Sequence, residues 1–285
     1  MNFKTNLFVG VAALACVIAT GASAQDLAGA APADTNFARD RNTSVMQRSR
    51  PGYEAIGLRV GGFMAWPKLT ATVEHNDNIY ATAAKTDDTI YHIAPEIALT
   101  SNWSRHALSV FAKGAIHRYS DFKDENTEDW SVGADSRIDV QRNTSIRLGA
   151  NTGRLTEPRS SASAPAAARS PIEYNLSDAN VGVSHEFNRL RLSARYDWQQ
   201  FDYKDVLTGA GANIDQDFRD RDTNTIMGRA EYAISPDTAI FLQASANKRE
   251  YRLAAVAPAV TRDSKGVEVL GGANFDIGAL MRGEI

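Results

Sequence analysis

Long runs in which apolar and polar side chains alternate at every second position most constrain the fold of this chain. Between residues 129 and 277 these runs extend for ten or more residues. In the clearest run, residues 190–198, five apolar or aromatic side chains would share one face of a strand and four polar ones the other. A period of two fits the pleat of a β-strand, whereas a helix would spread the arginines around its circumference. The sequence therefore predicts an all-β chain.

The length of the runs indicates what surrounds the strands. Residues 129–140 and 267–277 show the same sorting as residues 190–198. Soluble β-sandwiches also alternate, but ordinary strands contain about five to six residues, whereas a tilted membrane-crossing strand needs about nine to eleven. The longer runs favour transmembrane strands.

Tight turns and long polar connections alternate between the runs. We expect tight turns at residues 102–105, 141–144, 187–189, 235–238 and 276–279, and long loops at 121–128, 156–171, 204–221 and 254–265. A hairpin unit thus repeats about every 40 to 48 residues. Short periplasmic turns and long extracellular loops are typical of bacterial outer-membrane barrels. The predicted fold is an antiparallel transmembrane β-barrel.

The amino terminus predicts export from a Gram-negative cell. Residues 1–24 contain a positive Lys4, an apolar stretch at 7–18 and an Ala-Ser-Ala motif before Gln25, which is the pattern of a cleaved signal peptide. The only cysteine, Cys16, lies within it, so the secreted form would hold no thiol, disulfide or cysteine-ligated metal. Residues 25–50 lack periodicity and are expected to be a flexible periplasmic leader, and residues 51–285 the barrel.

The expected strand count leaves barrel closure open. About ten strands fit between Trp66 and Ile277, and an eleventh begins at Leu280. Bacterial single-chain barrels use even numbers of strands and leave no unpaired edge. We therefore expect the chain to be truncated at its carboxyl end; a miscount or a different pairing of the first segment would also explain the odd number.

Composition is compatible with a barrel but does not establish one. A hydrophobic fraction of 43%, a mean hydropathy of −0.33 and a net charge of −3 resemble a soluble protein, yet barrels conceal their apolar half in alternation. The balance of 31 basic and 34 acidic residues predicts no nucleic-acid partner. Outside the signal, no segment approaches the roughly 18 consecutive apolar residues of a spanning helix.

Several segments resemble a known family. Residues 66–69, 74–80, 93–97 and 105–108 are similar to the opening strands of the outer-membrane β-barrel porin family found in exopolysaccharide and capsule gene clusters. The Asn-Asp-Asn-Ile-Tyr segment at 76–80 is the most specific element, and the similarity extends over about residues 53 to 277. The early carboxyl terminus departs from the family pattern.

The resemblance implies a function without a residue-level mechanism. It implies an outer-membrane barrel that assists export or surface anchoring of an extracellular polysaccharide. The implied partners are outer-membrane lipid, an anionic polysaccharide, polysaccharide-export proteins and the barrel-assembly machinery. No cofactor is implied.

The sequence contains no pattern typical of catalysis or metal binding. The five histidines are scattered, with no ligand-like i, i+4 pair and no nucleophile elbow; they are His75, His92, His106, His117 and His185. Asn76-Asp77-Asn78 resembles part of a calcium loop but lacks its trailing Gly and Glu, so a polar turn is expected. We predict a non-enzymatic protein without catalytic, cofactor or metal residues.

The polar faces carry the remaining candidates. If they point inward, the lumen contains Arg147, Arg191, Arg195, Arg229 and Arg249 together with Asp129, Asp135, Asp139, Asp197, Glu231 and Glu268. These charges could pair across strands and stabilise the wall by about 0.2 to 1 kcal/mol per pair. Alternatively, Arg147, Arg191 and Arg195 could bind anionic sugar groups through bidentate hydrogen bonds.

Aromatic residues near the strand ends predict two interfacial girdles, as in other membrane barrels. The residues concerned are Trp66, Trp103, Tyr119, Trp130, Trp198, Tyr203, Tyr232 and Tyr251.

Three other functions fit the same sequence. A general diffusion porin would share the wall without a role for a polymer. A lipid-modifying barrel enzyme would need a nucleophile and a base near one rim. A secreted soluble β-sandwich would show the same alternation without contacting lipid.

Overall fold

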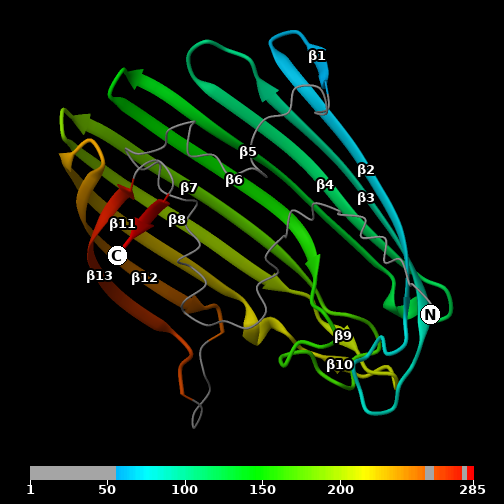
Figure 1. Ribbon diagram of the computed structural model, residues 1–285. Helices are drawn as coiled ribbons and strands as arrows, with labels where there is room; N and C mark the ends of the chain where they lie inside the picture. The colour runs from blue at the N-terminus through cyan, green and yellow to red at the C-terminus, as the bar shows by residue number, and fades with distance from the viewer. Residues whose placement is uncertain (1–55, 254–259, 278–280) are drawn as a thin grey trace, which may run out of the picture.

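The computed structural model describes residues 56–253, 260–277 and 281–285. Twelve strands of this part form one antiparallel sheet in which each strand pairs with the next, and a small two-stranded sheet, β9–β10, interrupts the order between β8 and β11 (Figure 1). The fold is all-β and antiparallel, as the alternation predicted.

The bounds of the strands in the large sheet are β1 Leu58–Val60, β2 Phe63–Asn76, β3 Asp88–Ser101, β4 Ala107–Tyr119, β5 Thr127–Gln141, β6 Thr144–Thr156, β7 Glu173–Phe187, β8 Leu190–Tyr203, β11 Arg221–Ser235, β12 Thr238–Tyr251, β13 Ser264–Ile277 and β14 Met281–Glu284. The small sheet contains β9 Val206–Leu207 and β10 Asn213–Ile214. Two single-turn 3-10 helices, η3 Lys123–Glu125 and η4 Asp217–Arg219, lie in loops. Nothing helical among the described residues has the length and hydropathy of a membrane span.

Ten strands, β2 to β8 and β11 to β13, contain 13 to 15 residues each. This length exceeds the nine to eleven residues that a tilted transmembrane strand needs. The first long strand begins at Phe63, three residues before the predicted start at Trp66, and the short β1 precedes it.

Tight turns gather at one end of the sheet and long loops at the other (Figure 1). We name the long loops L1 (77–87), L2 (120–126), L3 (157–172), L4 (204–220) and L5 (252–263); residues 254–259 of L5 lie outside the described residues. The turns between β5 and β6, β7 and β8, and β11 and β12 contain two residues each. The predicted turn at 276–279 lies partly outside the described residues.

The sheet is not closed among the described residues. Strand β1 stands at one edge and β14 at the other. Because β1 pairs only with residues 63–65, the rest of β2 is an edge, where Pro67 removes no backbone hydrogen bond from the ladder. The predicted signal peptide and leader lie outside the described residues.

The two faces of the curved sheet differ in chemistry and exposure. Apolar side chains such as Leu242 and Val267 are 60% and 80% exposed, whereas Glu231 and Phe241 of the opposite face are buried. Curvature spreads side chains apart on the convex face and crowds them on the concave face. The apolar face is therefore the outer, convex one, and the polar face is the inner one.

The outward apolar band crosses the strands obliquely. One cross-strand row contains Trp130, Arg154, Asn175 and Asp202, and so changes from aromatic on β5 to polar on β6 to β8. In a barrel the strands tilt from the axis, and a row perpendicular to the strands climbs from the lipid into water. The oblique band is what a tilted, membrane-embedded sheet requires.

The predicted aromatic girdles are partly wrong. Trp130, Trp198 and Tyr232 share the outer face, but Trp66, Tyr119, Tyr203 and Tyr251 lie on the inner face. Trp66 donates its indole N–H to Thr100 Oγ1 at 3.0 Å across two inner positions. Proximity to a strand end did not determine the face, since a shift of one residue reverses it.

Candidate functional site

Two neighbouring rows of the inner wall bring charged side chains together. Adjacent strands lie about 4.8 Å apart, and successive residues on one face of a strand about 6.8 Å apart. Register rather than sequence distance therefore decides which polar groups meet in the lumen.

The first row contains three arginines. Arg137 pairs with Arg147 across β5 and β6, and Arg147 pairs with Gly182, which pairs in turn with Arg195 of β8. Only the glycine separates the second arginine from the third. We call Arg137, Arg147 and Arg195 the arginine row.

Two members of the arginine row hold a carboxylate of their own strand. Arg137 Nε lies 3.0 Å from Asp139 Oδ1, and Arg195 Nε lies 2.8 Å from Asp197 Oδ1. Both acids follow their arginine by two residues, so each pair lies along the strand on the inner face. These pairs agree with the interpretation that inner charges stabilise the wall.

The second row, one step toward the long loops, carries oxygen-rich groups. It contains Asp135, Gly149, Asn180 and Asp197 in register. A side chain at Gly149 would come within 2.8 Å of the Asp135 carboxylate and still closer to the Asn180 amide. Because Gly149 has no side chain, the Asp135 carboxylate and the Asn180 amide can both lie over the backbone of β6.

Of the three predicted ligand residues, the structure brings only two together. Arg147 and Arg195 share the arginine row, but Arg191 lies four residues nearer the tight turn, about 14 Å from Arg195 along the strand. There Arg191 Nε bonds Glu186 Oε1 at 2.9 Å. Sequence reasoning missed Arg137, which register, not spacing, places beside Arg147.

The long loops fold onto the inner wall. Phe201 and Tyr203 continue the inner face of β8, and Tyr203 packs in an apolar cluster with Ala168 and Ile172 of L3 and Val206 of L4. Tyr174 of β7 stacks on Tyr203, with ring centroids 5.0 Å apart. Loops L3 and L4 therefore occupy the inner side of β7 and β8 at the long-loop end.

A buried ion pair joins L3 to L4. Arg219 Nη1 and Nη2 each donate to a different oxygen of Glu157 at 2.8 Å, and both side chains are about a tenth exposed. The Arg219 guanidinium also lies 3.9 Å from the centre of the Tyr203 ring. Burial opposes ionisation of Glu157, but hydrogen bonds from Arg219 and Ser161 hold its pKa below the ordinary value. The loop pair therefore stays charged at neutral pH.

Comparable contacts join the other loops. Arg159 of L3 donates to both oxygens of Glu125 in L2, with Nε to Oε2 at 2.8 Å. It also donates to the backbone carbonyls of Ala168 and Arg169. Tyr80 of L1 reaches Glu125 through its hydroxyl at 3.4 Å, and burial followed by the nearby Glu125 charge raises the pKa of Tyr80. Loops L1 to L4 thus form one connected layer.

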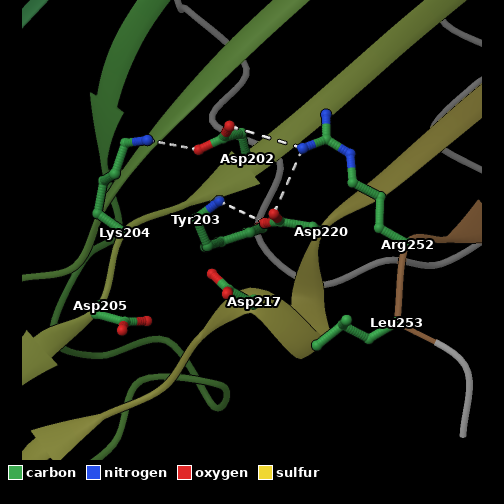
Figure 2. Close-up of a pocket in the computed structure, with 8 residues that line it drawn as sticks. All are labelled: Asp202, Tyr203, Lys204, Asp205, Asp217, Asp220, Arg252 and Leu253. Carbon is green, nitrogen blue, oxygen red and sulfur yellow. Dashed lines mark hydrogen bonds and ion pairs between the residues drawn. The ribbon is translucent and has the colours of Figure 1, made fainter.

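A cavity of about 520 Å³ opens between L4 and the start of L5 (Figure 2). Arg252 reaches Asp202 and Asp220 across it at 3.7 and 3.6 Å. Asp205 and Asp217 also line the cavity, and their carboxylates and that of Asp215 lie within 4.8 Å of one another. All three are exposed, and hydrogen bonds from Asn213 and the Gln216 backbone lower the pKa of Asp205.

Comparison with known proteins places the chain in a family. Residues 50–285 match the family described as "Putative beta-barrel porin 2". The chain belongs to this family. It is therefore an outer-membrane β-barrel protein of the porin type, as the opening strands suggested. No curated protein matches it.

Solved structures similar to this porin-family chain include the copper transporter OprC, at 10% identity and a TM-score of 0.42 over 75% of this chain and 38% of that one. The siderophore receptor PiuA from Acinetobacter baumannii matches at 12% identity and a TM-score of 0.42, over 75% of this chain and 43% of that one. The Pseudomonas putida toluene transporter TodX matches at 11% identity and a TM-score of 0.36, over 78% and 72%. The chain spans less than half the length of OprC and PiuA.

The histidines of this porin-family chain are less scattered than the sequence indicated. His92 and His117 are cross-strand partners on the inner face, with ring centroids 4.7 Å apart, and His92 Nε2 lies 3.1 Å from Glu74 Oε2. They are 25 positions apart in the chain, so no local spacing could have revealed the contact. The Asn76–Asn78 segment forms the expected polar turn, in which Asn78 N donates to Asn76 Oδ1.

Proposed function

We propose that this porin-family barrel is a water-filled channel that assists export of an acidic extracellular polysaccharide. The observation that carries the proposal is the arginine row. Like charges on directly opposed residues of neighbouring strands destabilise a sheet, and Arg137 and Arg147 are such a pair. Arg195 lies in the same row one strand further on, so an anionic partner in the lumen would be favoured by all three cations.

The geometry of the row suits carboxylate or phosphate groups along a chain. Arginine binds such groups through two parallel hydrogen bonds. Arg147 and Arg195 stand about 10 Å apart across Gly182, which contributes no side chain to the space between them. The Arg195 and Asp197 side chains are about a third exposed, so a solute anion can displace Asp197 without an uncovering step.

The second inner row complements a sugar rather than a simple ion. The carboxylates of Asp135 and Asp197 accept hydrogen bonds from hydroxyl groups, and the Asn180 amide donates and accepts them. These groups stand about 6.8 Å from the arginine row along the strands. A hydroxyl-rich chain with acidic substituents could contact both rows at once.

The proposed role is transport without chemistry. The chain belongs to a porin family. We infer that the polysaccharide passes through the lumen unchanged, and that the partners are polysaccharide-export proteins on the periplasmic side. A comparison of lipid mass spectra with and without the protein tests the enzymatic alternative; any new lipid species would contradict this inference.

Planar-bilayer recording tests the polymer role. Oligogalacturonate added to the wild-type channel should block single-channel current at a lower concentration than neutral linear dextran oligomers. The Arg147→Gln/Arg195→Gln variant should lose this difference. Arg118→Gln, which removes an outward-facing arginine paired with Glu128, is the matched control and should keep it. Equal blockade by both polymers in the wild type would refute the proposal.

A general diffusion porin is the second candidate, and the charge balance favours it. Loops L1 to L4 contain ten acidic and six basic residues, a net charge of −4, and several wall arginines are already paired. An acidic mouth would draw small cations rather than an acidic polymer. A large, weakly selective current that neither polymer blocks would support this candidate instead.

The route to the outer membrane is part of the proposal. Residues 1–24 are proposed to be removed on export, so that N-terminal sequencing of the membrane-inserted form begins near Gln25. A first residue within 1–24 would contradict the assignment.

A further inference from the structure

We propose that the tight-turn end of the barrel binds the acidic polymer before it enters the lumen, through one arginine in each of three successive turns. We call these residues, Arg105, Arg142 and Arg189, the turn arginines. The inference rests on the channel function proposed above and adds the end of the barrel at which the polymer first binds.

The turn arginines form a row across one end of the sheet. Arg105 lies between β3 and β4, Arg142 between β5 and β6, and Arg189 between β7 and β8, and all three are exposed. These turns lie at the same end of the sheet (Figure 1). Each is two strand spacings from the next, about 10 Å. The row therefore presents three cations to the water at the tight-turn end.

Two of the turn arginines are available to a partner. Within the part of the chain that the structure describes, the Arg142 and Arg189 side chains form no hydrogen bond and no ion pair. The acids nearest to them already bind wall arginines, since Asp139 holds Arg137 and Glu186 holds Arg191. The charges of Arg142 and Arg189 are therefore not neutralised by these acids.

The third turn arginine lies against the neighbouring hairpin. Arg105 donates through Nε and Nη2 to the backbone carbonyl of Asp139, and through Nη2 to that of Val140. Both carbonyls belong to the end of β5, next to the turn that carries Arg142. Because these acceptors are carbonyls and not carboxylates, the guanidinium keeps its net charge. Arg105 and Arg142 thus combine their charge at one hairpin.

The same hairpins continue the basic groups into the lumen. The β5–β6 hairpin carries Arg142 at its turn and the arginine row about 15 Å further in. The β7–β8 hairpin carries Arg189 at its turn, then Arg191 and Arg195 on the inner face, at steps of about 7 and 14 Å along the strand. A long acidic chain is able to contact the turns and the wall together. A lipid head group at the membrane surface would contact the turns alone, so the arrangement favours a polymer.

The two ends of the barrel differ in the sign of their charge. The described tight connections, residues 61–62, 102–106, 142–143, 188–189 and 236–237, contain three arginines and one aspartate, a net charge of +2 with His106 neutral. Loops L1 to L4 have a net charge of −4. Fields of this kind change association rates by about 10-fold to 1,000-fold. We therefore expect an acidic polymer to bind faster from the periplasmic side than from outside.

Single-channel recording in a phosphatidylcholine bilayer tests which end binds the polymer. Biotin attached to Gly209→Cys, an exposed position of L4, marks the loop side, because streptavidin changes the current only when it is added to the chamber that the loops face. In 0.1 M KCl and at equal driving voltage, oligogalacturonate should start blockades about ten times as often from the turn side as from the loop side. In 1 M KCl the ratio should approach one, because the screening length falls from about 10 Å to about 3 Å. Equal frequencies in 0.1 M KCl would overturn the inference.

The variant Arg142→Gln/Arg189→Gln tests the residues. It should lower the frequency of turn-side blockades to near the loop-side value and leave the duration of each blockade unchanged, since the wall arginines hold the polymer inside. The matched control, Arg118→Gln/Lys248→Gln, removes the same charge from the outer face of the sheet and should keep the excess from the turn side. Heat-modifiable gel migration verifies that each variant forms a barrel. An unchanged turn-side frequency in Arg142→Gln/Arg189→Gln would refute the role of the turn arginines.

Anionic lipid tests the other occupant of the turn arginines. Bilayers that contain phosphatidylglycerol should preserve the ratio of turn-side frequencies between the wild type and Arg142→Gln/Arg189→Gln. If the ratio fell to one, the turn arginines would be binding lipid head groups and the inference would be wrong.

These outcomes separate the inference from the proposed function. Stronger blockade by oligogalacturonate than by dextran, with equal frequencies from the two sides, would keep the polysaccharide role and refute the binding site at the turns. Equal blocking concentrations of the two polymers, with a turn-side excess of oligogalacturonate events that Arg142→Gln/Arg189→Gln abolishes, would refute the polysaccharide role and keep an anion-binding turn end.

Discussion

Two sets of arginines use the same chemistry for different purposes. In the loops, Arg219 and Arg159 each bind a glutamate of another loop, and Arg219 and Glu157 are 62 residues apart in the chain. On the wall, Arg137 and Arg195 hold acids only two residues away. The side chains of the two loop pairs are between 5% and 16% exposed. Those of the Arg195–Asp197 pair are about a third exposed.

The difference lies in what each pair constrains. A pair between distant loops fixes their relative position, and burial makes it costly to break. A pair along one strand constrains nothing that the sheet has not already fixed, and its exposure makes it weak. Loop arginines therefore hold the structure of the mouth, while wall arginines remain able to exchange a carboxylate for a solute.

The largest effect should follow Arg219→Ala. This change leaves Glu157 charged and unpaired between L3 and L4, which should destabilise the folded loops by about 3–5 kcal/mol. Because the strand pairing of the twelve-stranded sheet does not involve this ion pair, the barrel should still form. Hydrogen–deuterium exchange should accelerate in 157–172 and 204–220 and stay unchanged in β12.

The double variant Glu157→Ala/Arg219→Ala is the control for this cost. It removes the buried charge as well as its partner and should accelerate exchange less than the single variant does. Equal exchange in the two variants would mean that the pair is not coupled.

Acid should loosen the same loops, with a smaller effect. The folded pKa of Glu157 lies below its ordinary value of about 4.3, since Arg219 and Ser161 favour the carboxylate despite burial. A depressed pKa contributes stability that is complete above the ordinary value and is lost as pH falls through the folded pKa. Exchange in L3 and L4, corrected for its intrinsic pH dependence, should be constant from about pH 7 to 5 and rise below about pH 4.

Glu157→Gln separates this transition from others in the loop. Burial raises the pKa of Asp220, so protonation of Asp220 favours the folded loops and opposes the loosening. The acid-induced rise in exchange should disappear in the glutamine variant. Its persistence would assign the acid effect to another group.

The strands of the wall could be predicted from the sequence because the alternation of apolar and polar residues is a pattern among neighbouring positions. Alternation in residues 190–198 assigns Tyr196 outward and Arg195 inward, and the register confirms that these positions share faces with Ile226 and Gly182, respectively. Strand length and turn positions are also encoded within one hairpin. The girdle prediction used proximity to a strand end instead of alternation, which is why it did not place Trp66 and Tyr203 on the inner face.

The site could be predicted only in part because its contacts are set by register between distant strands. Arg137 and Arg147 are ten residues apart but meet across a tight turn, whereas Arg147 and Arg195 meet only through the intervening β7. The Arg219–Glu157 pair spans a loop, two strands and most of a second loop. No period or motif in the sequence connects such residues.

Arg195→Gln should change selectivity more than stability. An exposed pair contributes about 0 to 1 kcal/mol, so the unfolding midpoint should move little. Asp197 would be left without its cation, and the reversal potential in a KCl gradient should shift toward cation preference. The shift should be larger at 0.1 M than at 1 M salt, because the screening length falls from about 10 Å to about 3 Å. Arg118→Gln on the outer face should produce no shift.

The smallest effect should follow Arg169→Gln. This variant tests why an ion pair between loops is strong: because it is buried, or only because it joins two loops. Arg169 joins L3 to Asp124 of L2, as Arg219 joins L4 to L3, but both of its charged groups are 58% exposed. Water and salt screen such a pair, so exchange in 157–172 should match the wild type at 0.15 M salt. Asp124→Asn removes the other half of the pair and should give the same result. If either variant loosened L3 as much as Arg219→Ala does, loop connectivity rather than burial would account for the contrast between the two sets of arginines.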